Sequence, residues 1–150
     1  MNVLVCGSRT WTDRERMKSV LEKLREEFEG EIHLIVGGAR GADERACLLA
    51  EELGYTYENY YAQWDRYGRS AGPIRNKKMV DILVEEGGKL VLAFFGPGPC
   101  KGTWNTVKYA RTKELTVRGF PQEGISVGFS TEEDHDGKGS REVSTSVEGK

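Results

Sequence analysis

The sequence predicts an α/β fold: a doubly wound, mainly parallel sheet of five strands with helices on both faces. Two observations carry this prediction. Along residues 1–120, short apolar segments alternate with longer segments in which apolar residues recur at helical spacing. Three of the apolar segments (2–6, 32–36 and 89–95) are continuously hydrophobic, which is typical of parallel strands whose two faces are both buried.

The individual elements follow from local patterns. The expected strands are 2–6, 32–36, 55–61, 89–95 and 115–120. The expected helices lie between them, at 12–30, 41–54, 73–87 and 103–113. Thr12 and Glu15 have the spacing of a capping box at the start of the first helix. Gly72 and Pro73 have the pattern of a cap and a first helical residue at the start of the third.

Residues 121–150 differ from the rest of the chain. They hold seven acidic and three basic residues, whereas residues 1–120 hold 19 basic and 17 acidic residues. We therefore expect one domain over 1–120 and an acidic, Gly/Ser-rich tail over 121–150. Apolar residues alternate over 125–129, the pattern of one extra edge strand, and 130–150 is expected to be flexible.

Composition argues against several classes of protein. No apolar run approaches the roughly 20 residues of a membrane span, and the N-terminal run is too short for a signal peptide, so we expect a cytoplasmic protein. Three cysteines without a CxxC spacing and only two histidines argue against a disulfide framework or a metal site, and no cofactor is expected. The small net charge of −2 argues against a generic nucleic-acid binder.

Glycine-rich turns follow three of the expected strands: GSR at 7–9, GGARGAD at 37–43 and GPGPCKGT at 96–103. The carboxyl ends of parallel strands meet at one edge of the sheet, where such folds bind their ligands. Glycine lets backbone N–H groups approach an anion, and each following helix directs its positive end to the same place. Arg9, Arg40 and Lys101 add positive charge. We therefore predict a phosphate-binding site at this edge of the sheet, in the space that the glycines leave open.

The loop at 63–79 is the second part of the expected site. Trp64 and Tyr67 offer aromatic faces on which a base can stack. With Pro73 as first helical residue, Arg75 and Asn76 lie in the first turn. A cation is unfavourable there, because it repels the helix dipole, unless an anion is bound.

Asp43 lies at the start of the helix expected at 41–54. A carboxylate is favourable at this end of a helix. The residue either caps the helix, pairs with Arg40 or accepts a hydrogen bond from a ligand hydroxyl, and the sequence leaves the three roles open.

The standard phosphate motifs are absent. The turn at 7–9 does not continue as GxGxxG, and the strand at 32–36 ends in glycines instead of the acidic residue with which dehydrogenases bind a ribose. In GPGPCKGT, Lys101 precedes the last glycine, whereas it follows that glycine in a P-loop. Neither a dehydrogenase nor a P-loop ATPase is expected.

Four segments, in this order, resemble one family: VLVCGSRTWTD, VGGARGADERA, AGPIRNKKM downstream of a tryptophan, and AFFGPGPCKGTWNTVKYAR. Over about residues 2–118 the chain resembles the YpsA/YspA-related branch of the SLOG superfamily. The resemblance implies a Rossmann-like fold and binding of nucleotides or nucleotide-derived ligands, including products of NAD and ADP-ribose metabolism. It also implies self-association, as a homodimer or higher homo-oligomer, and a role in conflict between bacteria and phages.

Two relatives of that family supply alternatives. LONELY GUY phosphoribohydrolases carry PGGxGT followed by glutamate and cleave the base from a ribose monophosphate. This chain has Asn105 and Thr106 where the glutamates would fall, and an amide cannot act as a general base, so Asp43 or Asp65 would have to substitute. The DNA-processing protein A family, with a similar GSR turn and a GxARGxD-like segment, binds single-stranded DNA.

The resulting prediction is binding or sensing of a nucleotide-like small molecule, with hydrolysis or single-stranded DNA binding as alternatives. No catalytic residue is assigned. The residues expected to contact the ligand are Gly7, Ser8, Arg9, Gly37, Gly38, Arg40, Gly41, Asp43, Trp64, Gly72, Pro73, Arg75, Asn76, Gly96, Gly98, Gly102, Thr103, Asn105 and Thr106.

Overall fold

One sheet runs through the centre of the molecule, in the strand order β3-β2-β1-β4-β5-β6. The computed structural model describes residues 1–122 and 133–135. The first five strands are parallel, and they are β1 (Asn2–Gly7), β2 (His33–Val36), β3 (Thr56–Asn59), β4 (Leu90–Phe95) and β5 (Thr116–Pro121). This confirms the predicted doubly wound, Rossmann-like arrangement, in which strand order reverses between β1 and β4.

A sixth strand, β6 (Glu133–His135), pairs antiparallel with β5. It falls within 130–150, where no strand was expected. The edge strand expected at 125–129 lies outside the described residues. Pairing with β6 covers the hydrogen-bonding edge of β5, which would otherwise be open to other chains.

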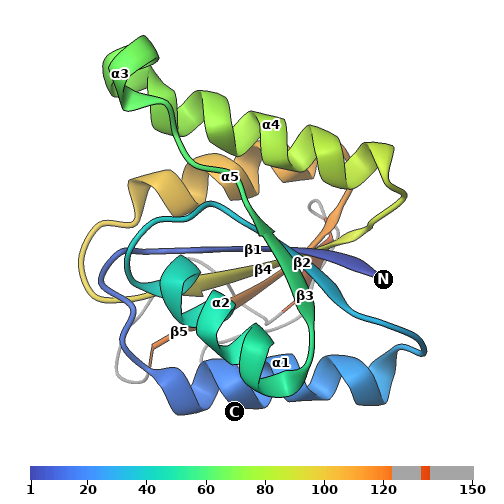
Figure 1. Ribbon diagram of the computed structural model, residues 1–150. Coiled ribbons are helices and arrows are strands. Elements are labelled where there is room, and N and C mark those ends of the chain that lie inside the picture. Colours follow the sequence, from blue (N-terminus) through green and yellow to red (C-terminus); the bar gives the residue numbers. More distant parts are fainter. Residues whose placement is uncertain (123–132, 136–150) are drawn as a thin grey trace.

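Helices cover both faces of the sheet (Figure 1). Their bounds are α1 (Arg14–Glu27), α2 (Ala42–Leu53), α3 (Trp64–Tyr67), α4 (Ala71–Glu85) and α5 (Lys101–Thr112), with a 3-10 helix, η1, at Gly68–Ser70. Helices α1 and α2 pack on one face, α4 and α5 on the other, and α3 projects from the start of α4 (Figure 1).

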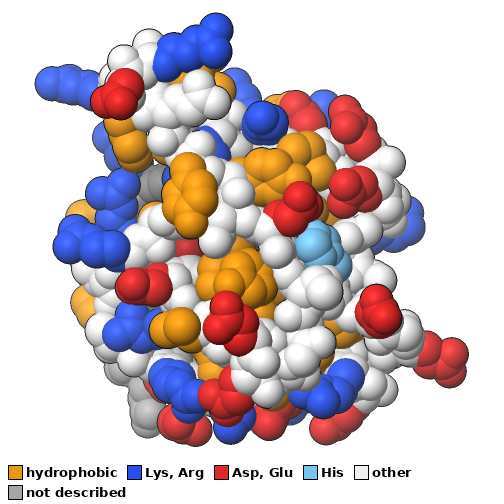
Figure 2. Space-filling view, viewed as in Figure 1, with side chains coloured by type: hydrophobic (Ala, Val, Ile, Leu, Met, Phe, Trp, Pro, Cys, Tyr) orange, Lys and Arg blue, Asp and Glu red, His pale blue; other side chains and the backbone are white. Residues whose placement is uncertain are grey.

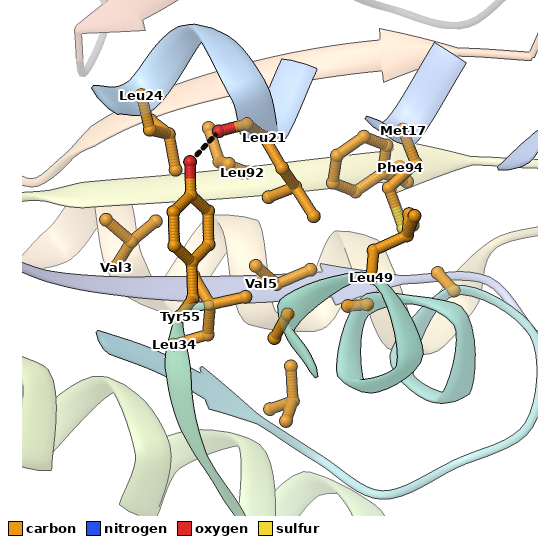
Figure 3. Packing of buried hydrophobic residues seen from close by; sticks show 14 of the residues in the cluster. Val3, Val5, Met17, Leu21, Leu24, Leu34, Leu49, Tyr55, Leu92 and Phe94 are labelled. Atoms are coloured by element: carbon orange, nitrogen blue, oxygen red, sulfur yellow. Dashed lines mark hydrogen bonds between the residues drawn. The ribbon is translucent and has the colours of Figure 1, made fainter. Parts of the chain in front are cut away.

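The core has two halves because side chains alternate along the buried strands. Val3 and Val5 point into the half under α1 and α2, and Leu4 and Cys6 into the half under α4 and α5. Figure 3 shows the first half, where the hydroxyl of Tyr55 donates a 2.5 Å hydrogen bond to the carbonyl oxygen of Leu21. This hydrogen bond links α1 to the residue that precedes β3, and it leaves the buried hydroxyl of Tyr55 with a partner.

The cap of α1 differs from the prediction. Asp13, not Thr12, is the N-cap, and its Oδ1 accepts a hydrogen bond from the backbone N–H of Arg16 at 3.0 Å. Thr12 is engaged elsewhere: its N–H and its hydroxyl both bond to the side-chain amide of Gln122. The expected capping box with Glu15 is therefore wrong, because the Thr12 hydroxyl instead accepts a hydrogen bond from Gln122, which is distant in the sequence.

The starts of α4 and α5 also lie earlier than expected. Ser70 is the N-cap of α4, so Pro73 is the third helical residue and Gly72 is not the cap. Arg75 is then beyond the first turn, which removes the dipole argument made for it. Helix α5 begins at Lys101, two residues before its expected start at Thr103.

Candidate functional site

An open pocket of about 210 Å³ lies at the carboxyl edge of the sheet. It is bounded by the turns after β1 and β2 on one side and by α3 and α4 on the other. Its lining residues are Arg9, Gly37, Gly38, Ala39, Arg40, Trp64 and Arg75. All of these except Ala39 are among the residues expected from the sequence. Figure 2 shows Lys and Arg side chains gathered over α3 and along the edge of the molecule below it.

Arg75 reaches the pocket from α4 and is held by three hydrogen bonds. Its Nη1 donates to the carbonyl oxygen of Gly37 and, at 3.3 Å, to that of Tyr60. Its Nε donates to Oδ1 of Asn76 at 2.9 Å. Partial burial lowers the pKa of Arg75, although a guanidinium stays charged. The Nη2 group makes no hydrogen bond within residues 1–122, so one edge of this fixed cation has no partner there.

Arg9 and Arg40 bring two more guanidinium groups to the pocket. Both are exposed, and neither forms an ion pair with an acidic side chain in residues 1–122. The guanidinium of Arg9 lies 5.9 Å from the ring centre of Trp64, within the range of a cation–π contact. Trp64 itself is 49% exposed, so it is not the core aromatic that a tryptophan often is.

Asp43 lies behind the pocket and is 6% exposed. Its Oδ2 accepts the N–H of Ala39 at 3.2 Å, while its Oδ1 is buried without a hydrogen-bond partner. Burial raises the pKa of this carboxyl to about 6, against the opposing effects of the Ala39 N–H and the charge of Arg75. Of the roles left open, pairing with Arg40 is wrong, because no ion pair joins the two side chains, and the cations that lower the pKa of Asp43 are Arg75 and Arg9.

The glycines of the second turn make room for protein atoms. A Cβ on Gly37 would lie 2.9 Å from Nη1 of Arg75 and from Oδ2 of Asp43. A Cβ on Gly41, whose φ is +79°, would lie 2.5 Å from the carbonyl groups of Ser8 and Arg9. These positions are glycine because α2, α4 and the β1 turn approach the backbone closely.

The turns after β1 and β4 are bonded to each other. Ser8 is buried, and its Oγ accepts the N–H of Gly96 at 2.8 Å. The hydroxyl of Thr10 donates to the carbonyl oxygen of Pro97 at 2.7 Å. The 96–103 turn does not line the pocket, which opens instead on the β2 side of β1.

Nine further residues expected to contact the ligand do not line the pocket: Gly7, Gly72, Pro73, Asn76, Gly98, Gly102, Thr103, Asn105 and Thr106. One of them, Asn76, joins α4 to α5, since its Nδ2 donates to the carbonyl oxygen of Gly102 at 3.5 Å, and the Thr106 hydroxyl donates to the same carbonyl within α5. Cys100, at the end of the turn after β4, is buried, and its thiol lies 3.5 Å from the carbonyl oxygen of Gly96.

Sequence reasoning missed the residues that follow β3. The carbonyl oxygen of Tyr60 holds Arg75, and the ring of Tyr61 occupies the space that a side chain on Gly38 would need. Tyr61 is 67% exposed, so its ring extends the aromatic surface beside the pocket. The repeated tyrosines of YTYENYY were the available signal, because β3 neighbours β2 and its end lies at the same edge.

Two further properties concern only the described part of the chain. It contains no cluster of three or more His, Cys, Asp or Glu side chains that would hold a metal ion. Within it, the longest and most apolar helices fall short of what a membrane crossing requires.

Comparison with known proteins gives three likenesses. Residues 1–67 match the YspA, cpYpsA-related SLOG family. The gene 61 protein of Mycobacterium phage D29 is 32% identical over 123 residues, which cover 79% of this chain and 94% of the phage protein. The structure of DNA processing protein A from Streptococcus pneumoniae is similar with a TM-score of 0.57 at 17% identity, over 83% of this chain and 51% of that one.

The structural likeness shows a shared fold, and this chain spans about half the length of the Streptococcus protein. The family match covers the chain from β1 to the end of α3, which is the half of the chain that supplies most of the pocket. From this match, together with the similarity to the phage protein over nearly its whole length, the chain belongs to the YspA, cpYpsA-related SLOG family.

Proposed function

We propose that the pocket binds a nucleotide or a nucleotide-derived ligand through its phosphate groups. The observation that carries the proposal is the convergence of Arg9, Arg40 and Arg75 on one pocket beside the exposed ring of Trp64. Guanidinium groups suit bidentate binding of phosphate oxygens, and an indole ring suits stacking of a base. Membership of the family, through the resemblance drawn from the sequence, supports the same class of ligand.

The size of the pocket fits the phosphate end of such a ligand. About 210 Å³ is smaller than the roughly 300–1,000 Å³ that encloses a whole drug-sized molecule. The phosphate would lie between the three guanidinium groups, with the free Nη2 of Arg75 as the fixed donor. The base would then lie outside, against Trp64 and near Tyr61, which are both exposed.

Binding is favoured over hydrolysis because no lining residue has a carboxylate. The carboxyl of Asp43 is the closest candidate, but it is buried behind the turn and already accepts the Ala39 N–H. The fold shared with DNA processing protein A is compatible with single-stranded DNA binding and does not favour it over a small ligand.

The test is ligand binding by the full chain. Protein purified from cells is denatured and its released small molecules are identified by mass spectrometry. The apo protein is then titrated by calorimetry with AMP, NAD and ADP-ribose. We expect one of these to bind, and we expect Arg40→Ala to weaken that binding about 10- to 100-fold, the loss of one or two charged hydrogen bonds.

Lys101→Ala is the matched control, since Lys101 is an exposed cation at the same edge that does not line the pocket. Its affinity should stay within twofold of the unchanged protein. The proposal fails if none of these ligands binds, or if Arg40→Ala and Arg75→Ala both bind the ligand as tightly as the unchanged protein does. Release of free base or ribose phosphate would show turnover and replace binding by hydrolysis.

A further inference from the structure

The two helical layers of the molecule carry opposite charge. Residues 13–31 and 42–54, which contain α1 and α2, hold six basic and eleven acidic residues. Residues 64–89 and 101–114, which contain α3, α4 and α5, hold ten basic and five acidic residues. The layers lie on opposite faces of the sheet (Figure 1). A charge of about −5 therefore faces one way and about +5 the other, and the small net charge of the whole chain hides this separation.

Some carboxylates of the acidic layer are held in ion pairs, whereas the exposed lysines of the basic layer are not paired within residues 1–122. Glu52 of α2 is paired with Arg14 and Lys18, and Glu27 of α1 with Arg118. By contrast, the exposed lysines of α4 and α5, together with the lysine that follows α5, form no ion pair with any side chain in residues 1–122, and they are Lys77, Lys78, Lys101, Lys108 and Lys113. Unpaired exposed ammonium groups on one face attract an external anion.

The rings on this face are already occupied. Tyr109 lies between the ammonium groups of Lys77 and Lys113, 5.7 and 5.2 Å from its ring centre, and its hydroxyl donates to Asp81 at 2.7 Å. Trp104 packs against Phe95, with ring centres 4.8 Å apart. These rings are not free to stack on bases, so the surface presents charge without an aromatic platform.

Three of the five acidic residues of the layer sit at its far end. Glu85 closes α4, Glu86 follows it, and Glu114 follows α5. Lys77 and Lys78 lie midway along α4, Lys101 begins α5, and Lys108 lies in its second half, so the positive charge extends along both helices. Arg66 of α3 and Arg69 of η1 continue the basic surface beyond the start of α4, next to Asp65.

We propose that the outer face of α4 and α5 is a docking surface for the phosphodiester backbone of a nucleic acid. Ammonium groups spread over two neighbouring helices match a chain of phosphates better than a single phosphate, and occupied rings predict no preference for base sequence. A second copy of the chain, with its acidic layer against this surface, is the competing occupant, and it would appear as salt-sensitive dimerisation without nucleic-acid binding. This surface is separate from the pocket and does not depend on it.

The test is fluorescence anisotropy of the full chain with a labelled 20-nucleotide single strand and the corresponding duplex, between 50 and 200 mM salt. We expect binding at the low salt that falls steeply as salt rises, since counterions are released from each contacted phosphate. Lys108→Glu should weaken binding at least fivefold and lower the salt slope by about 1. Lys23→Glu, the same charge change at an exposed position of α1, should stay within twofold.

Three results would overturn this surface: no binding at 50 mM salt, equal losses in Lys108→Glu and Lys23→Glu, or retention on anionic lipid vesicles without nucleic-acid binding. If Arg40→Ala loses affinity for the nucleic acid and Lys108→Glu does not, the nucleic acid binds in the pocket, and the proposed docking surface is also overturned. The reverse pattern, Lys108-dependent nucleic-acid binding without any nucleotide bound in the pocket, would support this surface while the proposed function fails.

Discussion

Two glycine-rich turns at the same edge of the sheet have opposite characters. The turn after β2 forms one wall of an open pocket, and Gly37 and Gly38 line it. The turn after β4 is closed onto the β1 turn by the bonds of Ser8 and Thr10 to Gly96 and Pro97. Glycine in a turn after a parallel strand therefore indicates close backbone approach, and only the neighbouring side chains show whether the approaching group is a ligand or the protein.

Charge separates the two turns further. Three guanidinium groups surround the first, with a carboxyl buried behind it. Beside the second, the hydroxyls of Ser8 and Thr10 use their hydrogen-bonding capacity within the protein. Substitutions in the first turn are therefore expected to weaken binding of the proposed ligand, whereas substitutions in the second turn should lower only the stability of the folded protein.

The largest effect is expected for Gly41→Ala. The position combines a φ of +79° with carbonyl groups of the β1 turn 2.5 Å from the new Cβ, so we expect a loss of more than about 3 kcal/mol in the free energy of unfolding. Gly98→Ala is the matched control, because its φ is +84° but no atom lies within 4 Å of the new Cβ. It should cost about 1–2 kcal/mol. Urea denaturation measures both, and equal losses would show that the close approach is not the cause.

Asp43→Asn should stabilise the protein at high pH. The pKa of about 6 in the folded state exceeds the roughly 3.9 of an unfolded chain, so the folded state binds the proton more tightly and this group lowers stability as pH rises through 6. Removing the charge should raise the free energy of unfolding at pH 8 by up to about 3 kcal/mol, and by about half of that at pH 5.

The measurement is chemical denaturation of both proteins at the two pH values. If the difference in unfolding free energy between the two proteins is the same at pH 8 and pH 5, the Asp43 carboxyl titrates outside this range. A destabilised variant would mean that the hydrogen bond from Ala39 requires a full carboxylate charge.

Ser8→Ala sharpens the contrast between the two turns. Removing the Oγ leaves the buried N–H of Gly96 without its acceptor, which should cost about 1–3 kcal/mol of stability. Because Ser8 does not line the pocket, affinity for a nucleotide ligand should stay within twofold. Thermal denaturation and calorimetry test the two halves of this prediction, and a tenfold loss of affinity in a fully folded variant would contradict it.

The sheet and its helices could be predicted because their signals are local. Continuous apolar runs gave β1, β2 and β4, and helical spacing of apolar residues gave α1, α2, α4 and α5. Helix α3 was missed, because WDRY is one turn long and has no buried residue to create a period. The Thr12 cap was also wrong, because its competitor Gln122 is 110 residues away in the sequence.

The candidate site could be predicted only in part. Glycine, arginine and tryptophan types pointed to the correct edge of the sheet, and six of the seven lining residues were among those expected. The sequence could not show that carbonyl groups from two other loops would hold Arg75 in place. Nor could it show that the Ser8 hydroxyl would accept a hydrogen bond from the Gly96 N–H. Such bonds join elements from different parts of the chain, and no local pattern encodes them.

The bond between Ser8 and Gly96 has a consequence for folding order. The two residues are 88 positions apart, and the N–H of Ser8 also donates to the carbonyl oxygen of Phe94. The β1 turn, which carries Arg9, therefore has its final support only after β4 has docked beside β1. Contacts of such long sequence separation form slowly, because the intervening loop must close first. A nascent chain that has completed β1, β2 and β3 would hold most pocket residues yet lack their anchorage, and ligand binding should appear among the last events of folding.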